Sequence, residues 1–465
     1  MTATSSTSGA TSAAPVALAR TRPRPPVRHV HLGLGSFFRA HQAWYTHHAP
    51  DGQAWGIAAW TGRRPGLARS LEAQDALYTL GVRGPDGDRF EVVESLAEAR
   101  AADDHASWLR HLADPDVALV TTTVTEAGYA RRADGGLDLD RADVRADLEA
   151  LRASPAAPVR TAPARLVAGL AARRRADAGP LTLVPCDNLP GNGAAVARVV
   201  RDLADALDPA LAAWVEAHVT SVTTMVDRIT PEPTAEDVAR VRAAGLDDAV
   251  PVVTEPFSEW VLAGTFAAGR PAWDAAGALV VDDVEPYEQR KLWLLNGAHS
   301  LLAYAGLARG RTTVAEAIAD ETCRSWVEEW WDEASAHVPL PQPEVAAYRA
   351  ALLERFANPR IRHRLDQIAA DGSLKLPVRV LPTLRAERER GRLGAGASRV
   401  VAAWVHHLRG PLPVRDAQAE AARAAAEGPL APAVRRVLGL LDPAVAEDET
   451  VVAAVLAQVE EVGRS

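Results

Sequence analysis

Residues 290–300, RKLWLLNGAHS, hold three side chains suited to proton transfer: Lys291, Asn296 and His299. The chain has 51 Lys plus Arg, and because only Lys291 and Lys375 are lysines, the other 49 are arginines. A guanidinium stays protonated at any usable pH, whereas a buried lysine can lose and regain a proton near neutrality. A lysine kept in an arginine-rich chain therefore indicates acid–base chemistry, with chance survival as the alternative.

Taken as an α-helix, residues 288–299 turn four polar groups to one side. Relative to Lys291, Glu288 lies at about 60°, His299 at about 80° and Asn296 at about 140°. This set suits a secondary alcohol whose hydride passes to a nicotinamide. Lys291, its pKa lowered by burial and a neighbouring imidazole, would take the hydroxyl proton, and Asn296 would donate to the oxyanion. His299 would hold substrate hydroxyls or relay the proton; the plainer readings are a surface lysine and a core histidine.

A glycine turn near the start of the chain predicts a dinucleotide site. The apolar run 27–32 leads into Gly33 and Gly35 and then into a helical pattern. These match the first two glycines of G-x-G-x-x-G, which allow a sharp turn and close approach of the backbone to a pyrophosphate. Phe38 occupies the third position, which predicts a different docking of the helix. An ordinary turn is the alternative, but the position at the head of a strand–helix series favours a cofactor.

The remaining pattern predicts an α/β fold. Strand-like runs at 55–60, 116–126, 181–188 and 219–229 alternate with helical segments, as in a doubly wound parallel sheet. After residue 282 the pattern is almost wholly helical. We therefore predict a disordered leader (1–26), a Rossmann-type dinucleotide-binding domain (27–282) and a mainly α-helical substrate and catalytic domain (283–465).

Composition excludes several classes of function. The net charge of -9 argues against a nucleic-acid partner, and no apolar run reaches the roughly 18 residues of a membrane span. Cys186 and Cys323 suit a reducing cytoplasm, and Cys186 fits a small buried hydrophobe better than a nucleophile. No carboxylate or cysteine at ligand spacing accompanies the N-terminal histidines, so no metal is predicted at His29, His31, His41, His47 and His48.

The cofactor's phosphorylation state depends on the residues after the second strand. An enzyme specific for NAD would carry an acidic residue there, but the chain has Thr61, Gly62, Arg63 and Arg64. The arginines would face the 2′-phosphate of NADP, or lie on a solvated loop. We predict NAD, with NADP as the alternative.

The pattern K-x4-N-x2-H, formed by Lys291, Asn296 and His299, resembles the catalytic motif of the polyol-specific long-chain dehydrogenases, the mannitol dehydrogenase and fructuronate reductase family. Further segments resemble the family in order and over most of the chain. They are GLGSFFRAHQAWYT, QDALYTL, TVTEAGY, PCDNLPGNG, MVDRITP, EPFSEWVLAGTFAAGRPAW and DGSLKLPVR.

The resemblance implies metal-independent hydride transfer by a monomer, at a site between the two domains. It implies Lys291 as the general base and Asn188 and Asn296 as oxyanion donors. Independently, Asn188 and Asp227 end predicted strands, where such a sheet collects its ligands. The other implied roles are substrate contact by Asp227, His299 and Lys375, gating by Glu288, and cofactor contact by Gly33, Leu34, Gly35, Ser36, Phe37, Phe38, Thr123 and Val124.

The segment 367–379, QIAADGSLKLPVR, resembles the mannonate-type members, with Gln367 where mannitol-type members more often carry Arg. A substrate carboxylate needs a fixed cation, which Lys375 with Arg379 or Arg360 would supply. We predict a fructuronate reductase, interconverting D-mannonate and D-fructuronate, with both lysines facing one substrate. The alternatives are mannitol 2-dehydrogenase and other polyol dehydrogenases. A non-catalytic dinucleotide-binding protein would have a broken catalytic set, and here the set is complete.

Overall fold

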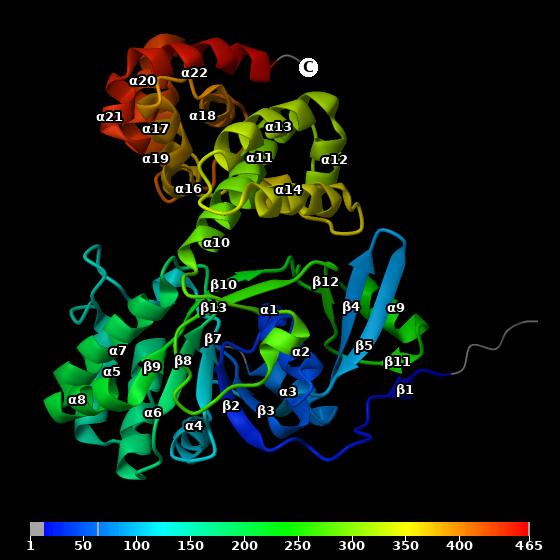
Figure 1. Cartoon of the computed structure of the whole chain (residues 1–465), viewed down its shortest axis with the longest axis vertical. Helices are drawn as coiled ribbons and strands as arrows, with labels where there is room; N and C mark the ends of the chain where they lie inside the picture. Colours follow the sequence, from blue (N-terminus) through cyan, green and yellow to red (C-terminus); the bar gives the residue numbers. More distant parts are fainter. Residues whose placement is uncertain (1–13, 63–64, 464–465) are drawn as a thin grey trace, which may run out of the picture. The chain divides into compact units, whose positions relative to one another are not determined.

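The structure is a computed structural model that describes residues 14–62 and 65–463. Two compact units divide the chain, residues 1–282 and 283–465 (Figure 1). Arg63 and Arg64, on which the NADP alternative depends, lie outside the described residues, as do the first 13 residues of the predicted leader.

A six-stranded parallel sheet forms the centre of the first unit. Its strands run in the order β6-β3-β2-β7-β8-β9. Counted along the chain this is the 3-2-1-4-5-6 order of a Rossmann fold, and the order reverses between β2 and β7. The strands are β2 (Val27–Leu32), β3 (Gly56–Trp60), β6 (Leu96–Arg100), β7 (Leu119–Thr122), β8 (Leu181–Pro185) and β9 (Val219–Ser221). The predicted doubly wound fold is confirmed.

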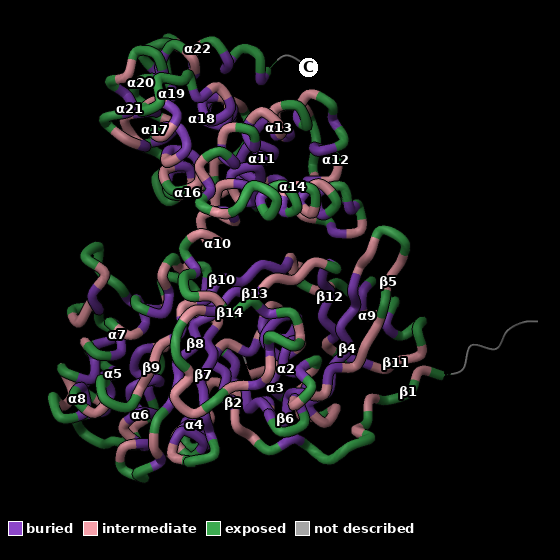
Figure 2. The backbone as a smooth tube through the Cα atoms, in the orientation of Figure 1, coloured by how far each residue is buried: buried purple, intermediate pink, exposed green. Residues whose placement is uncertain are grey.

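Both faces of this sheet are buried, as a parallel sheet requires (Figure 2). Successive β3 residues enter opposite cores: Ala58 and Trp60 pack on one face, Ile57 and Ala59 on the other. The first core includes α4 (His105–Leu112), α5 (Ala142–Ala153), α6 (Ala162–Arg175), α7 (Asn192–Leu207) and α8 (Pro209–His218). The second includes α1 (Ser36–Ala40), α2 (Gln42–His48) and α3 (Gly66–Ala73).

Three smaller sheets were not predicted. The hairpin β4 (Tyr78–Gly84) and β5 (Gly87–Val93) pairs with β12 (Val252–Thr254), and β10 (Thr223–Asp227) pairs with β13 (Glu259–Ala263), which pairs with β14 (Leu279–Val280). Along the chain, α9 (Ala235–Ala243) lies between β10 and β12. The predicted single strand 219–229 is therefore wrong. It breaks at Val222 into β9 and β10, which belong to different sheets, so Asp227 does not end a strand of the parallel sheet.

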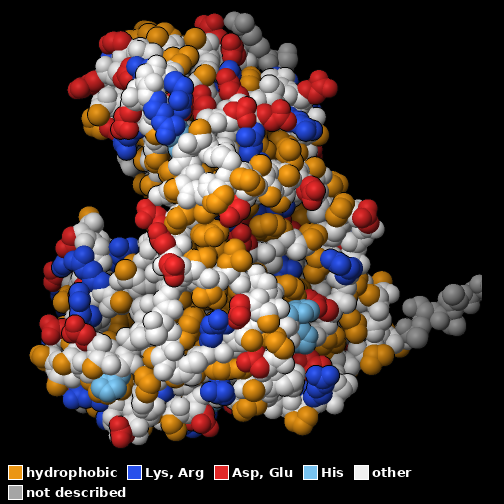
Figure 3. All heavy atoms as spheres, viewed as in Figure 1, with side chains coloured by type: hydrophobic (Ala, Val, Ile, Leu, Met, Phe, Trp, Pro, Cys, Tyr) orange, Lys and Arg blue, Asp and Glu red, His pale blue; other side chains and the backbone are white. Residues whose placement is uncertain are grey.

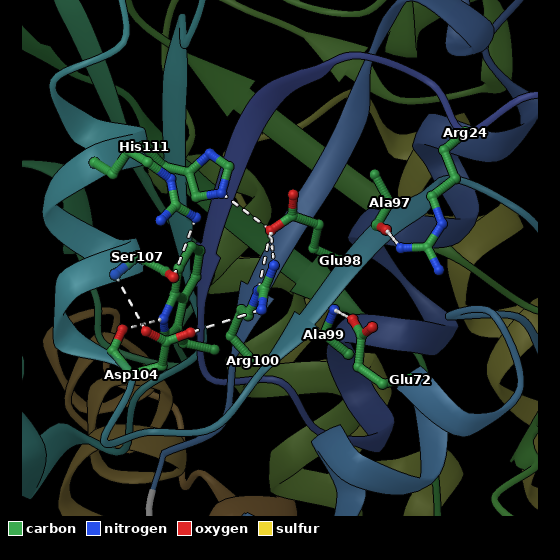
Figure 4. A network of polar contacts seen from close by, with 11 residues as sticks. Arg24, Glu72, Ala97, Glu98, Ala99, Arg100, Asp104, Ser107 and His111 are labelled. Atoms are coloured by element: carbon green, nitrogen blue, oxygen red, sulfur yellow. Dashed lines mark hydrogen bonds and ion pairs between the residues drawn. The ribbon is translucent and has the colours of Figure 1, made fainter.

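The outer edge of β6 is held by polar side chains (Figure 4). Glu72 accepts from the Ala99 N–H (2.7 Å), and Arg24 donates to the Ala97 carbonyl (2.8 Å). The hydrogen bond from His111 lowers the pKa of Glu98 to about 2. The contacts of Glu72 and Arg24 occupy backbone groups of the kind that an exposed edge strand leaves open to pairing with another chain.

The predicted disorder of residues 1–26 is wrong for residues 14–26. The two residues of β1 (Val16–Ala17) pair with β11 (Leu246–Asp247), and Arg20 donates to the carbonyl of Glu94 at 2.9 Å. Ser, Thr and Pro enrichment suggested disorder, but arginines that bind backbone carbonyls fix this segment along the sheet edge.

The second unit is helical. At its centre α11 (Ala298–Ala308) packs against α12 (Val314–Ala319), α13 (Glu321–Ser335) and α18 (Ala395–Arg409). The other helices are α10 (Glu285–Arg290), the π-helix η4 (Lys291–Gly297), α14 (Gln342–Ala357), α15 (Leu365–Ile368), α16 (Gly372–Arg379), α17 (Leu381–Glu389), α19 (Ala419–Ala426), α20 (Leu430–Leu441), α21 (Pro443–Glu447) and α22 (Glu449–Val462). Trp330, Trp331 and Trp404 are fully buried among them, as core tryptophans.

On the face shown in Figure 3, acidic and basic side chains are interspersed. Within residues 14–62 and 65–463, none of the helices has the length and apolar character that crossing a membrane requires.

Candidate active site

The helix that carries Lys291 is not uniformly α-helical. Residues 291–297 form a π-helix between α10 and α11. Its hydrogen bonds join residue i to residue i+5, so a side chain five positions on lies about one turn away. The spacing of Lys291 and Asn296 is five. The predicted separation of about 140° is therefore wrong, and the two side chains lie on one side of the helix, one turn apart.

The backbone of Asn296 is fixed by two side chains. The Ser300 hydroxyl donates to its carbonyl at 3.1 Å, and the Arg379 guanidinium donates to the same oxygen at 3.4 Å and to the Ser300 Oγ at 3.3 Å. Arg379 thereby ties α16 to the π-helix. Glu288 lies on α10, in the turn before Lys291, and both are half-buried.

His299 is buried and neutral. Its ring contacts Phe356 (4.8 Å between centroids) and His363 (4.9 Å), and within the described residues its Nε2 atom has no hydrogen-bond partner. Burial, with His363, Arg355 and Arg379 nearby, holds the pKa of His299 well below its usual range. A ring with so low a pKa carries no positive charge near neutral pH.

Lys375 lies one turn before Arg379 on α16. Its Nζ atom donates to the carbonyls of Ala370 (2.6 Å) and Ile368 (3.4 Å). Burial and the charge of Arg379 lower the pKa of Lys375. Because α16 packs against the π-helix, the structure brings the helices of the two lysines together. That both contact one substrate stays a prediction.

In the first unit, the glycine turn lies at the point where the strand order reverses. Gly33 follows β2, and Thr123 follows β7, its neighbour. Gly33 has a φ of +117°, and a Cβ there would lie 2.4 Å from the Thr123 carbonyl oxygen, so only glycine fits. A Cβ on Gly35 would meet no other residue closer than 3.5 Å, at Gly33 O. The backbone at this turn is therefore open to a ligand, as pyrophosphate binding requires.

The first helix docks on the sheet differently from the helix that follows a complete G-x-G-x-x-G turn. Phe38 is fully buried and stacks on the His31 ring, with centroids 3.6 Å apart and 12° between planes. The helix is short: α1 stops at Ala40, and α2 starts at Gln42. An aromatic stack thus replaces the close helix–strand contact that a third glycine allows.

Below the turn runs a buried chain of hydrogen bonds that sequence reasoning missed. His29 Nε2 and His31 Nδ1 both contact the Thr121 hydroxyl (2.6 and 2.7 Å), and His31 Nε2 contacts the Thr123 hydroxyl (3.1 Å). Because Thr123 donates to the Gly33 carbonyl (2.8 Å), it accepts from His31 Nε2–H. Thr121 then donates to His31 Nδ1 and accepts from His29. Two spacings in the sequence could have indicated this chain: H-x-H on β2, and T-x-T at the end of β7.

The loop that carries Asn188 is held by its neighbour. The Asp187 carboxylate accepts from the Tyr129 hydroxyl and from the Val124 N–H, and from Thr122 at 3.2 Å. Burial raises the pKa of Asp187 to about 7 despite these donors. Asp187 therefore joins the loop after β8 to the segment that contains Thr123 and Val124, two predicted cofactor contacts.

The strand that ends at Asp227, β10, is joined to the Asn188 loop by a buried side chain. The buried Asn192 side chain donates to the carbonyls of Asp187 (3.1 Å) and Thr224 (2.9 Å) and accepts from the Thr224 N–H (2.9 Å). It ties the Asn188 loop to β10, the strand that Asp227 ends. Asn192 lies in the segment PCDNLPGNG, but nothing in the sequence around it indicated that its side chain joins two strands.

The N-terminal histidines have structural contacts. His41 binds the Glu259 carbonyl (3.0 Å) and packs on Phe37 and Trp260, and His48 pairs with Glu91 (2.9 Å). In the part of the chain that the structure describes, no three His, Cys, Asp or Glu side chains gather as metal ligands would. Cys186 is buried, and burial raises the pKa of its thiol well above its usual value, as a core position implies.

Comparison with known proteins assigns this arrangement to a family. Residues 27–275 match the mannitol dehydrogenase Rossmann domain, and residues 283–463 match the mannitol dehydrogenase C-terminal domain. The chain belongs to the mannitol dehydrogenase family. The predicted resemblance and the predicted fold are thereby confirmed, and the chain is an oxidoreductase of this family.

Relatives in the family differ in substrate. D-mannonate oxidoreductase of Escherichia coli is 39% identical, covering 82% of this chain and 80% of that protein. D-arabinitol 4-dehydrogenase of Ralstonia nicotianae is 40% identical, covering 79% and 80%. The solved structure of Pseudomonas fluorescens mannitol 2-dehydrogenase, a ternary complex with NAD and D-mannitol, is 32% identical with a TM-score of 0.80, covering 94% of this chain and 92% of that one.

Proposed function

We propose that the chain is a nicotinamide-dependent secondary-alcohol dehydrogenase that interconverts D-mannonate and D-fructuronate. Sequence identity does not choose the substrate, because the mannonate and arabinitol enzymes are almost equally similar. The observation that carries the choice is the cationic surroundings of His299. Arg355 and Arg379 lie near enough to lower its pKa, and Lys375 lies near Arg379. Cations so placed suit the carboxylate of a sugar acid.

The proposed chemistry assigns one task to each side chain. The glycine turn would hold the pyrophosphate of the dinucleotide, and the bound cofactor would supply the hydride acceptor for the substrate carbinol carbon. Lys291 takes the hydroxyl proton, which leaves the ketone, and gives it back in the reverse direction. Asn296, one π turn away, donates to the same oxygen, as we propose for Asn188. His299 binds a neighbouring hydroxyl through its buried Nε2.

For the cofactor we propose NAD. The turn at Gly33 and Gly35 fits a dinucleotide, and the similar mannitol 2-dehydrogenase structure contains NAD. Thr123 and Val124, held by Gly33 and Asp187, are proposed to line the same site with Leu34, Ser36, Phe37 and Phe38. We propose a metal-independent, cytoplasmic monomer.

A second candidate is mannitol 2-dehydrogenase, favoured by the similarity to a structure that holds D-mannitol. In this case D-fructose would replace D-fructuronate, and Asp227 and His299 would bind neutral hydroxyls. The cations near His299 would then have no substrate charge to meet.

A substrate panel separates the two. We expect kcat/KM for D-fructuronate reduction to exceed that for D-fructose at least about 10-fold, since a charged hydrogen bond contributes about 1.5–3 kcal/mol. The variant Lys375→Met should lower kcat/KM for D-fructuronate and leave that for D-fructose within a factor of two. Reduction of D-fructose with D-fructuronate inert would contradict the substrate assignment. A protein that turns over neither D-fructuronate, D-fructose nor D-arabinitol would contradict the proposed dehydrogenase activity itself.

A further inference from the structure

Two consecutive tryptophans hold two consecutive carbonyls of the π-helix. On α13, Trp330 Nε1 donates to the carbonyl of Trp293 at 3.0 Å, and Trp331 Nε1 donates to the carbonyl of Leu294 at 2.9 Å. Both indoles are fully buried. The contacts reach the middle of the segment between Lys291 and Asn296.

A π-helix needs such support. It is rare beside the α-helix, into which the same residues could wind, and it occurs mainly as single turns at functional sites. Where a helix changes from α to π and back, backbone groups lose their i→i+4 partners, and buried ones must be paired elsewhere. Indole donors from a neighbouring helix supply this pairing only while the carbonyls keep their π positions.

Packing reinforces the hydrogen bonds. A Cβ on Gly297 would lie 2.7 Å from the Trp330 ring, so the indole lies directly on the last residue of the π-helix. The Trp331 ring stacks on Phe356, with centroids 6.0 Å apart, and Phe356 contacts His299. Trp330 and Trp331 thus contact the backbone between Lys291 and Asn296, and Trp331 also contacts Phe356, the neighbour of the His299 ring.

We propose that Trp330 and Trp331 are positioning residues that hold the helix of Lys291 and Asn296 in its π form and so keep the two catalytic side chains on one side. The inference rests on the proposed function, because it concerns the alignment of a base with an oxyanion donor. Without the indole N–H groups the segment relaxes towards an α-helix, in which Asn296 turns to about 140° from Lys291.

The test removes each indole N–H and keeps an aromatic ring, with Trp330→Phe, Trp331→Phe and the double variant in the full chain. Misplacement of a reacting group by about 1 Å costs up to about 100-fold. We expect kcat to fall about 10- to 100-fold, and KM for the sugar and the affinity for NADH to change less than about 3-fold. The matched control is Trp108→Phe, which removes a buried indole bond to the Arg165 carbonyl (2.8 Å) in the other unit and should leave kcat unchanged.

A double-mutant cycle with Asn296→Ala distinguishes positioning from loss of stability. If Trp331 acts by aligning Asn296 with Lys291, Trp331→Phe should cost at least about 3-fold less in the Asn296→Ala background. Equal costs in both backgrounds would overturn the inference, as would a double tryptophan variant with wild-type kcat.

The Lys291→Ala variant separates this inference from the function on which it rests. Loss of turnover in Lys291→Ala together with wild-type kcat in the tryptophan variants overturns the positioning role alone. Wild-type turnover in Lys291→Ala overturns both. Should Trp330→Phe fold poorly, Trp331→Phe carries the cycle by itself.

Discussion

At the scale of single residues, the chemistry depends on which groups are kept neutral. His299 is a buried neutral imidazole, and His29 and His31 are neutral because burial lowers their pKa values, for His29 to about 3. A neutral imidazole donates at one nitrogen and accepts at the other, so it can transmit a directed hydrogen bond. The chain from His29 to Gly33 depends on this property.

Thr121 is the residue on which that chain depends most. The substitution Thr121→Val removes the partner of both His29 Nε2–H and His31 Nδ1 and leaves two buried polar atoms unpaired, which costs about 2 kcal/mol or more. We expect the urea midpoint of unfolding to fall accordingly. Thr121→Ser, which keeps the hydroxyl, should recover most of the loss; a Thr121→Val protein as stable as wild type would contradict the role of the hydroxyl.

Asp187 predicts a pH dependence of stability. Its pKa is raised to about 7 by burial, whereas an unfolded aspartate has a pKa of about 3.9. The folded state therefore holds this proton more tightly, and the contribution of Asp187 to stability falls as the pH rises from about 4 to about 7. The groups that face it are Tyr129, Thr122, Cys186 and the Val124 N–H.

Replacing Asp187 by Asn removes this ionisation and keeps the shape of the protonated acid. We expect the stability of Asp187→Asn to fall less than that of wild type between pH 4 and pH 7, measured by urea unfolding at each pH. Parallel curves for the two proteins would show that Asp187 already titrates normally.

At the scale of elements, sequence patterns predicted β2, β3, β7 and β8, because apolar runs buried on both faces stand out, but they missed β6 at the sheet edge. Gly33, Lys291, Asn296 and Asn188 were predicted as site residues for a different reason: each lies at a turn or near a strand end, or has a spacing with chemical meaning, and their roles stay predictions. The break at Val222 was missed, since one apolar run can serve two sheets. The π-helix was missed because nothing local in KLWLLNG distinguishes i+4 from i+5 bonding. Its support comes from Trp330 and Trp331, far away in sequence.

Gly297 tests the packing of that π-helix. A methyl group there would lie 2.7 Å from the Trp330 ring, so Gly297→Ala should destabilise the protein by about 1–3 kcal/mol and lower kcat. The control is Gly439→Ala in α20, where the nearest atom would be 3.7 Å away. In that helix interior alanine should stabilise by up to about 1 kcal/mol, seen as a higher Tm. The same sign for both variants would contradict the described contact.

At the scale of the whole molecule, the two units carry separate parts of the proposed activity. Residues 1–282 contain the glycine turn and Asn188, and residues 283–465 contain Lys291, Asn296, His299 and Lys375. Variants of the second unit should therefore change turnover without changing the affinity for NADH. This separation makes a single substitution at Lys291 informative.

The most direct measurement is the turnover of Lys291→Arg. Arginine keeps the positive charge and most of the length of the side chain, but it does not release its proton at a usable pH. With NADH binding measured in parallel by fluorescence, we predict wild-type cofactor affinity and a kcat for D-mannonate oxidation at least about 100-fold below wild type, the usual contribution of a general base. A Lys291→Arg enzyme that turns over at the wild-type rate would contradict the account, because Lys291 would then not be the base.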